Sequence, residues 1–129
     1  MTQSDLLPTL VSIALFGALG ALSRYVCSYL PNYMGISIGT ATVNIVGSLL
    51  LGISTSIFLV APYPTWLKTG ITTGFLGAFT TFSTFSVENA KLIQEQSYLA
   101  AGVNIVGQIV LGVTMALLGL YLGTKWFQG

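Results

Sequence analysis

Long apolar segments separated by short polar breaks run through almost the whole chain. A helix needs about 20 mostly apolar residues to cross a hydrocarbon core of roughly 30 Å. Prolines and clusters of polar residues end these segments, and proline cannot continue a helix. The pattern therefore predicts four transmembrane helices, over residues 6–30, 36–61, 66–94 and 98–126.

The third segment differs from the others in its middle. Every residue from 80 to 86 is Thr, Ser or Phe, and Gly70, Gly74 and Gly77 precede them. Hydroxyl side chains bond to nearby backbone groups and glycine has a low helix propensity, so both weaken a helix. Loosened backbone at membrane depth is tolerated only where it is buried in protein or lines a water-filled cavity. We expect the third helix to be broken near mid-membrane, with its hydroxyls and phenyl rings facing something that passes there.

Composition sets the class of protein. Apolar residues make up 53% of the 129 residues and charged residues 5%, whereas soluble domains carry roughly 25% charged residues. We predict an all-α membrane protein whose single four-helix domain covers residues 1–129. Histidine is absent, Cys27 is the only cysteine and the formal net charge is +1. These counts exclude a cysteine metal cluster, an intrachain disulfide and a basic surface for nucleic acid, and no pair of nucleophile and base predicts an enzyme.

Positive charges are divided evenly between the two predicted sides of the membrane. The side of both termini and the second connection carries Lys68 and Lys125, and the other side carries Arg24 and Lys91. An excess of Lys and Arg on the cytoplasmic side normally sets orientation. Two explanations stay open: insertion in both orientations, or a weak bias that the count does not resolve. Dual insertion suits the small size, because an antiparallel dimer supplies the inverted repeat that many transporters build within one chain.

Amide side chains and one arginine lie within the predicted helices. Asn44 is in the second helix, and Asn104 and Gln108 are one turn apart in the fourth. Polar side chains at membrane depth face the protein interior, so each amide either bonds a neighbouring helix or donates to a substrate. Arg24, near the end of the first helix, either extends to the interface or holds a positive field that attracts anions.

Two simpler patterns accompany these residues. Glu88 precedes Lys91 by one helical turn, which favours an ordinary pairing between them. Glycines recur along the helices, where small residues let membrane helices approach closely. We interpret most of them as packing positions: Gly17, Gly20, Gly47, Gly52, Gly102, Gly107, Gly112, Gly119 and Gly123.

An aromatic stripe alternates with hydroxyl residues in the third segment. Phe79, Phe82 and Phe85 recur every three residues, which places them on one side of a helix or of a loosened turn. The edge of a phenyl ring carries partial positive charge. Rings presented edge-on beside hydroxyl and amide donors suit a small anion, whereas cations prefer ring faces or carbonyl oxygens.

Three stretches are specific enough to suggest a family. They read G-A-L-G-A-L-S-R-Y (residues 17–25), G-T-A-T-V-N-I-V-G (39–47) and G-F-L-G-A-F-T-T-F-S-T-F-S-V-E (74–88). The chain resembles the small bacterial fluoride channels of the Fluc or CrcB family in length, number of spans and order of motifs. The resemblance implies a dual-topology antiparallel homodimer in the bacterial inner membrane, with two pores along the subunit contacts. It also implies passive export of cytoplasmic fluoride and hence fluoride resistance.

The resemblance implies roles for residues that match the motifs. Asn44 is the expected pore donor of the second helix, and the ring edges of Phe82 and Phe85 are expected to coordinate fluoride. Arg24 is expected at the pore vestibule. The expected hydroxyl lining is Ser83, Thr84 and Ser86.

The resemblance further implies a structural Na⁺ ion at the dimer interface, bound by the backbone carbonyls of Gly77 and Thr80. One departure concerns the fourth helix, where the family often has hydroxyl residues and this chain has Asn104, Gln108 and Gly112. Amides donate hydrogen bonds as hydroxyls do. We therefore retain Asn104 and Gln108 as pore residues.

Two rival functions remain to be weighed. A proton-coupled exporter of the small multidrug-resistance type also uses short four-helix chains with dual topology, but it needs a carboxylate near the middle of the first helix. Residues 6–30 contain no acid, and Asp5 lies just before that segment. A non-transporting assembly subunit would leave the hydroxyl and phenylalanine cluster without a purpose. The sequence therefore favours the fluoride channel.

Overall fold

The computed structural model describes residues 3–128, so residues 1, 2 and 129 of the predicted domain lie outside it. Most of the chain is helical, as the hydrophobic pattern predicts. The elements in chain order are α1 (Gln3–Cys27), β1 (Asn32–Tyr33), β2 (Ile36–Ser37), α2 (Ile38–Val60), α3 (Thr65–Thr69), the π-helical segment η1 (Gly70–Leu76), α4 (Gly77–Phe79), α5 (Phe82–Gln94) and α6 (Tyr98–Gln128).

Within the described residues, three helices are long and apolar enough to cross a membrane. They contain the stretches Asp5–Cys27, Ile38–Val60 and Tyr98–Trp126, and match the first, second and fourth predicted segments. The third predicted segment, residues 66–94, is not one continuous helix. It is divided among α3, η1, α4 and α5.

A small β-hairpin connects α1 to α2. Its strands β1 and β2 pair antiparallel, and Met34 and Gly35 between them have positive φ angles of 53° and 79°. Positive φ at both turn residues is typical of a two-residue hairpin turn. Ser37 then caps α2, because its Oγ accepts a hydrogen bond from the N–H of Thr40 at 3.2 Å. The all-α prediction missed this hairpin, since two-residue strands are too short to leave a periodic pattern.

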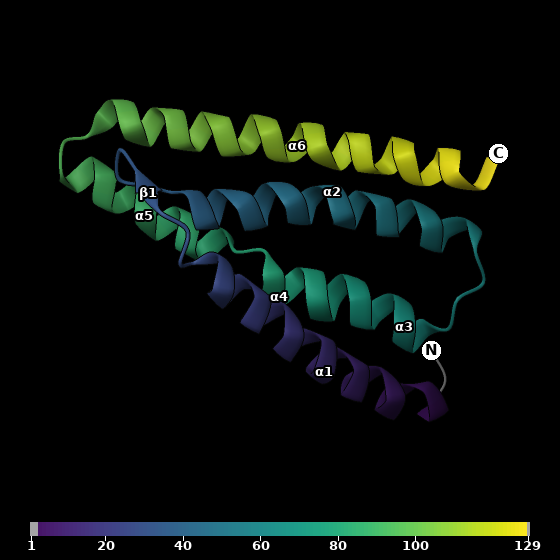
Figure 1. Ribbon diagram of the computed structural model, residues 1–129. Coiled ribbons are helices and arrows are strands. Elements are labelled where there is room, and N and C mark those ends of the chain that lie inside the picture. The colour runs from purple at the N-terminus through teal and green to yellow at the C-terminus, as the bar shows by residue number, and fades with distance from the viewer. Residues whose placement is uncertain (1–2, 129) are drawn as a thin grey trace.

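The helices lie side by side in the order α6, α2, the interrupted third segment and α1 (Figure 1). The most extensive contacts join α2 to α6 and α1 to η1. The described termini and the α2–α3 connection lie at one end of the bundle, and the hairpin and the α5–α6 connection lie at the other (Figure 1). The third segment therefore runs between the two ends although its helix is interrupted.

Glycine allows α2 and α6 to lie in close contact. A methyl group at Gly119 of α6 would overlap the carbonyl of Leu49 in α2, and one at Gly52 of α2 would overlap the carbonyl of Ala116 in α6. Backbones approach this closely in membrane proteins only where side chains are small. These two glycines are packing positions, as the sequence indicates.

The same explanation holds on the other side of the third segment but not everywhere. A methyl group at Gly20 of α1 would overlap the carbonyl of Phe75 in η1. Gly102 and Gly107 of α6, in contrast, have open space around them. Packing within the described chain does not explain those two.

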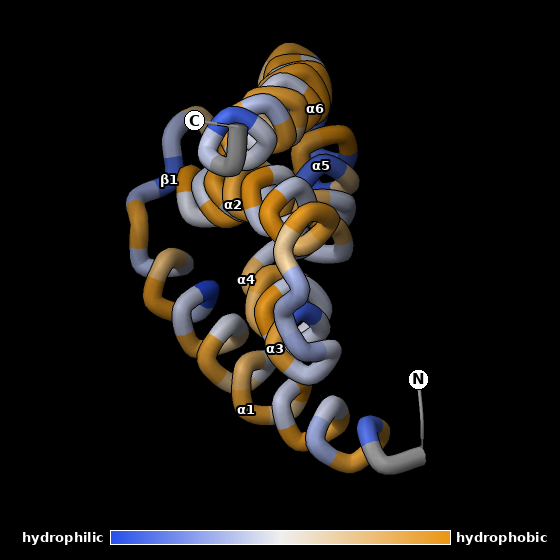
Figure 2. The backbone as a smooth tube through the Cα atoms, turned by 90° about the vertical axis from the view of Figure 1, so that its right-hand side faces the viewer, coloured by the Kyte–Doolittle hydropathy of each residue, from blue (hydrophilic) through white to orange (hydrophobic). Residues whose placement is uncertain are grey.

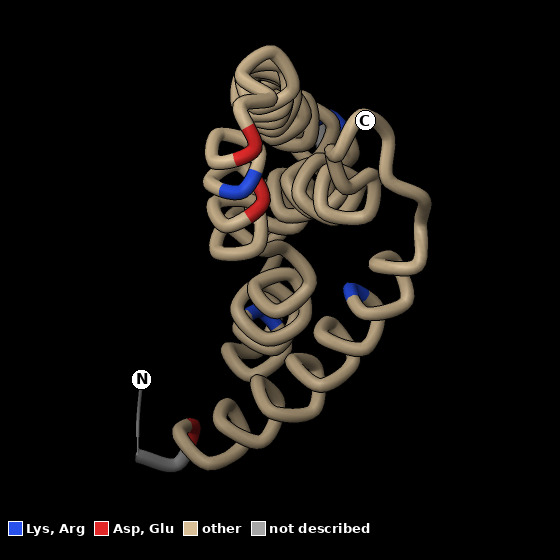
Figure 3. Tube along the Cα trace, turned by 90° about the vertical axis from the view of Figure 1, so that its left-hand side faces the viewer, with Lys and Arg blue, Asp and Glu red and all other residues tan. Residues whose placement is uncertain are grey.

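The outer faces of the bundle are apolar, and charges are few. Large apolar side chains are exposed along α1 and α6, including Leu15 and Val106. Hydrophobic residues predominate along both helices (Figure 2). Apolar surface on this scale suits hydrocarbon rather than water. Figure 3 shows few charged residues along the trace, and most of the chain carries none. Glu88 and Lys91 both lie in α5.

Candidate functional site

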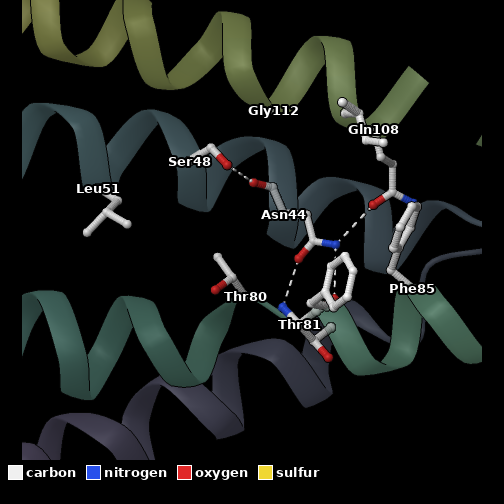
Figure 4. A pocket seen from close by; sticks show the side chains of 10 residues that line it. Asn44, Ser48, Leu51, Thr80, Thr81, Phe85, Gln108 and Gly112 are labelled. Atoms are coloured by element: carbon white, nitrogen blue, oxygen red, sulfur yellow. Dashed lines mark hydrogen bonds between the residues drawn. The ribbon is translucent and has the colours of Figure 1, made fainter. Parts of the chain in front are cut away.

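The third segment is interrupted at Thr80 and Thr81, between α4 and α5 (Figure 4). Thr80 has φ −79° and ψ 156°, and Thr81 has φ −150° and ψ 109°, so both are extended. Thr81 caps α5, because its Oγ1 accepts from the N–H of Thr84 at 3.2 Å. Thr80 Oγ1 donates to the carbonyl of Leu76 at 3.0 Å. The threonine hydroxyls thus bond the backbone on both sides of the interruption.

Asn44 of α2 bonds both backbone groups of Thr81 (Figure 4). The Thr81 N–H donates to Asn44 Oδ1 at 2.8 Å, and Asn44 Nδ2 donates to the Thr81 carbonyl at 3.1 Å. An interrupted helix leaves backbone groups without helical partners, and leaving such groups unpaired away from water costs free energy. Asn44 therefore stabilises the interruption.

A chain of side-chain amides continues from Asn44. Its Nδ2 also donates to Gln108 Oε1 at 2.9 Å, and Gln108 Nε2 donates to Asn104 Oδ1 at 2.8 Å. Asn104 Nδ2 donates to Asn89 Oδ1 at 3.1 Å, and Asn89 Nδ2 donates to the carbonyl of Phe85 at 2.7 Å. Asn89, Asn104 and Gln108 are buried. The structure thus brings together the three amides singled out in the sequence, and both N–H groups of Asn44 bond protein atoms.

Phe82 and Phe85 line a cavity of about 250 Å³ beside the interruption, together with Asn44, Gln108 and Thr81. The two ring centroids are 5.7 Å apart and the planes are tilted by 42°. Phe85 is 8% exposed and Phe82 is 79% exposed. The cavity therefore combines phenyl rings with amide groups, and one of its rings lies on the outer surface of the chain.

Phe79 does not belong to this group of rings. It is buried and stacks on Phe75, with centroids 5.8 Å apart and planes within 10°. The expected single stripe of Phe79, Phe82 and Phe85 is wrong, because the extended residues Thr80 and Thr81 separate α4 from α5 and change the direction of the side chains between them.

The hydroxyl residues expected to line a pore are distributed over different places. Thr84 lines a second cavity, of about 300 Å³. Ser86 is exposed, and its Oγ donates to the carbonyl of Phe82 at 2.9 Å. Ser83 is exposed as well, and its Oγ lies 3.4 Å from Thr81 Oγ1. The structure places these two hydroxyls on the surface of α5.

Arg24 contributes to the second cavity, whose lining includes Thr81 as well. It is half-buried, and its Nη1 donates to the carbonyl of Thr80 at 3.3 Å. A fixed positive charge beside the interruption raises the local concentration of anions. Tyr25 lines this cavity too, and its hydroxyl lies 2.8 Å from that of Tyr29. That hydrogen bond, with a smaller contribution from burial, raises the pKa of the Tyr29 hydroxyl above its usual value.

Glu88 bonds α2 rather than Lys91. Its Oε1 accepts from Thr40 Oγ1 at 2.5 Å, and its buried Oε2 has no hydrogen-bond partner among the described residues. Between residues 3 and 128 the structure forms no ion pair of Glu88 with Lys91. The pairing expected from the helical spacing was wrong because Thr40 of α2 bonds the Glu88 carboxylate instead.

The backbone at the interruption is compatible with a bound cation. In a continuous α-helix the N–H of Thr81 would bond the carbonyl of Gly77, but here it donates to Asn44. The carbonyl of Thr80 accepts from Arg24, and a carbonyl oxygen has a second lone pair. Carbonyl oxygens released from helical bonding are suitable ligands for Na⁺. The residues present therefore fit the expected ion, with Arg24 as a competing positive charge on one oxygen.

Sequence reasoning missed Thr81 and Asn89 as members of the site. In the sequence, Asn89 lies among the polar residues near the end of the third predicted segment. Its position four residues after Phe85, on the same helical face, was a signal that it faces inward. Thr81 was treated as one hydroxyl among several, because its backbone role depends on the non-local contact with Asn44.

Comparisons with known proteins agree on one family. The family described as "CrcB-like protein, Camphor Resistance (CrcB)" matches residues 11–120. A protein of Syntrophotalea carbinolica named "Fluoride-specific ion channel FluC" is 47% identical over 120 residues, which cover 90% of this chain and 98% of that protein. Proteins of the same name from Geobacter metallireducens and Vibrio vulnificus are 40% and 44% identical. They are matched over 87% and 85% of this chain and 94% and 90% of their own lengths.

Proposed function

Because the chain belongs to the CrcB-like protein family, we propose that it is a fluoride-specific ion channel through which cytoplasmic fluoride leaves the cell passively. Fluoride enters cells as the weak acid HF and ionises in a more neutral cytoplasm, so an open anion pathway relieves its accumulation. Its relatives are ion channels and not enzymes, so no residue is assigned a catalytic role. The expected consequence for the cell is fluoride resistance.

One observation carries the proposal: two phenyl rings and two amides line one cavity beside an interrupted helix, inside an apolar bundle. Phe82 and Phe85 share a cavity with Asn44 and Gln108. Fluoride is small and strongly hydrated, so it must exchange water for other hydrogen-bond donors to enter a narrow pore. Phenyl edges and N–H groups carry the partial positive charge that can replace water around an anion. A cation prefers ring faces and carbonyl oxygens.

A passive mechanism fits the titratable groups of the bundle better than proton coupling does. A proton-coupled exporter needs an ionisable group in mid-membrane. The acidic residue of α1, Asp5, lies in its first turn, and the chain contains no histidine. Membership of a channel family also argues against the exporter and against an assembly subunit.

The proposed assembly is an antiparallel homodimer with two pores along the subunit contacts. Phe82 lines the cavity and yet is 79% exposed, so a second copy that covers this face would complete the wall around an ion. The even division of Lys68 and Lys125 against Arg24 and Lys91 supports insertion in both orientations. Fluoride and a second copy of this chain are the proposed partners.

A structural Na⁺ at the centre of that dimer is part of the proposal. The carbonyls of Gly77 and Thr80 would hold it. The N–H of Thr81, which would bond the Gly77 carbonyl in a continuous helix, donates to Asn44 instead. A bound Na⁺ would supply a fixed positive charge that offsets the carbonyl dipoles gathered at the break. The chain's own contribution is to keep the break extended, through the two hydrogen bonds between Asn44 and Thr81.

The chain is a multi-pass membrane protein, since three of its described helices are apolar and of spanning length. We place it in the bacterial inner membrane with four crossings, the fourth supplied by the interrupted segment from α3 to α5. The arrangement of the connections supports this count, because that segment runs between opposite ends of the bundle (Figure 1).

Ion efflux from liposomes tests the proposal. Purified protein is reconstituted in vesicles loaded with potassium fluoride or potassium chloride, valinomycin is added, and the external anion is followed with an ion-selective electrode. Fast release of fluoride without release of chloride is the expected result. Release of neither anion from folded protein would contradict a fluoride channel, and equal release of both would contradict a fluoride-specific one.

A further inference from the structure

Four side-chain amides, three of them buried, form a chain whose hydrogen bonds all run in one direction. The chain starts at the N–H of Thr81, passes through four side chains and ends at the carbonyl of Phe85. In order, these side chains are Asn44, Gln108, Asn104 and Asn89. At each step a nitrogen donates to the oxygen of the next group in this order.

The two ends of the chain determine the orientation of every amide between them. A backbone N–H can only donate and a backbone carbonyl can only accept. If Gln108 or Asn104 were rotated by half a turn, two oxygens would face each other at one contact and two N–H groups at the other. The arrangement is therefore the one in which all five contacts of the chain are satisfied together.

The chain begins and ends at the start of α5, but its middle lies on other helices. Thr81 caps α5 and Phe85 lies in its first turns, while Asn44 belongs to α2 and Gln108 to α6. The bonds thus close a ring around the interruption and tie it to both neighbouring helices. A change at one member leaves a buried amide group unpaired, and such networks act as more than the sum of their pairs.

We propose that Asn89, Asn104 and Gln108 act as one positioning unit that holds the Thr81 backbone and the Phe85 ring in place for the passing anion. The role in conduction rests on the proposed function, whereas the mechanical coupling does not. Asn89 is the informative member, because it bonds Asn104 and the Phe85 carbonyl and reaches Thr81 only through the rest of the chain.

Hydrogen–deuterium exchange tests the coupling without reference to conduction. Asn89→Ala, Asn104→Leu and Gln108→Met are compared in the purified full chain by mass spectrometry of peptides that cover residues 80–86. Each is expected to raise exchange of the Thr81 amide by roughly threefold to twentyfold, the range that corresponds to one interhelical hydrogen bond in a membrane protein. The double variant Asn104→Leu with Gln108→Met should raise exchange little beyond the larger of the two single effects. Both substitutions interrupt the same series of hydrogen bonds, so their effects are not additive.

Ser56→Ala is the matched control. The Oγ of Ser56 donates to the carbonyl of Leu120 at 2.8 Å, so this variant also removes a buried polar contact between α2 and α6, but outside the amide chain. Exchange at residues 80–86 should stay at the level of the unsubstituted chain. Equal exchange in Asn89→Ala and Ser56→Ala, or effects of Asn104→Leu and Gln108→Met that multiply, would overturn the proposal.

Fluoride and chloride efflux from the same proteins then tests the role in conduction. The positioning unit predicts that the fluoride-to-chloride ratio falls in all three chain variants and not in Ser56→Ala. Altered exchange with an unaltered ratio would overturn the positioning role in conduction. If the unsubstituted chain releases no fluoride, the proposed function fails, and the exchange result alone decides whether the amides act as one unit.

Discussion

At the level of single residues, the site depends on where the two phenyl rings lie. Phe85 is packed inside the chain and Phe82 is 79% exposed on its surface, although both line one cavity. A side chain that is exposed in one copy contributes little to the stability of that copy. Phe82 can therefore be changed without disturbing the packing inside one copy.

We predict that Phe82→Ile leaves the helical fold intact and lowers fluoride flux. Loss of an aromatic contact of about 0.5–1.5 kcal/mol corresponds to a flux reduced by roughly twofold to tenfold. Flux is measured with a fluoride electrode on liposomes, and folding is checked by circular dichroism. Phe58→Ile is the control, since Phe58 packs on Tyr63 away from the cavity, with centroids 5.5 Å apart. Equal flux in the two variants would contradict a pore role for Phe82.

Residue spacing predicted the polar members of the site better than it predicted their contacts. Asn44, Asn104 and Gln108 were singled out because amides at membrane depth face inward, and the structure joins them in one hydrogen-bonded chain. Helical spacing failed for Phe79, because that prediction assumed regular geometry across an irregular backbone. It failed for Glu88 because Thr40 of α2 bonds the Glu88 carboxylate instead. Local periodicity carries no information on the angle at which a chain resumes after a break.

At the level of helices, close backbone contact between α2 and α6 depends on Gly119. We predict that Gly119→Val destabilises the protein by about 1–3 kcal/mol, because the added atoms would overlap the Leu49 carbonyl. Thermal unfolding in detergent, followed by circular dichroism, measures the effect. Gly102→Ala is the matched control, since open space surrounds Gly102. An unchanged unfolding midpoint in Gly119→Val would show that this contact does not hold the helices together.

The interruption between α4 and α5 leads to a prediction about sodium. If the carbonyls of Gly77 and Thr80 bind Na⁺, the folded dimer gains stability from the ion and the unfolded chain does not. At a Na⁺ concentration of 100 times the dissociation constant the gain would be about 2.7 kcal/mol. The unfolding midpoint should therefore rise with sodium chloride and not with N-methylglucamine chloride of equal ionic strength. The same unfolding midpoint in both salts would contradict a stabilising Na⁺ site at these carbonyls.

The helices themselves were largely predictable, but their interruption was predictable only in outline. Segments 36–61 and 98–126 correspond to α2 and α6 within a few residues, because long apolar runs dictate membrane helices. The run of Thr, Ser and Gly indicated a weakened third helix. That the backbone extends at Thr80 and Thr81 depends on Asn44, which is distant in sequence, so no local pattern specifies it.

At the level of the whole molecule, the account requires subunits in opposite orientations. We predict that added positive charge at one end forces a single orientation and abolishes fluoride resistance. Thr65→Arg with Thr124→Arg adds charge at the end that holds the described termini, and Asn32→Arg with Gln94→Arg adds it at the other. All four side chains are exposed.

Growth of fluoride-sensitive bacteria measures the outcome. Each double variant alone should fail to restore growth in fluoride, and the two produced together should restore it, because only the pair supplies both orientations. Full growth with either double variant alone would contradict the antiparallel dimer. The unsubstituted chain serves as the positive control.

The most direct test of a fluoride-selective pore is the reversal potential of the purified protein in a planar bilayer with fluoride on one side and chloride on the other. The account predicts a potential set by the fluoride gradient alone and unchanged when the chloride concentration is varied. A potential that follows chloride, or that follows the cation when the cation is exchanged, would contradict the central claim.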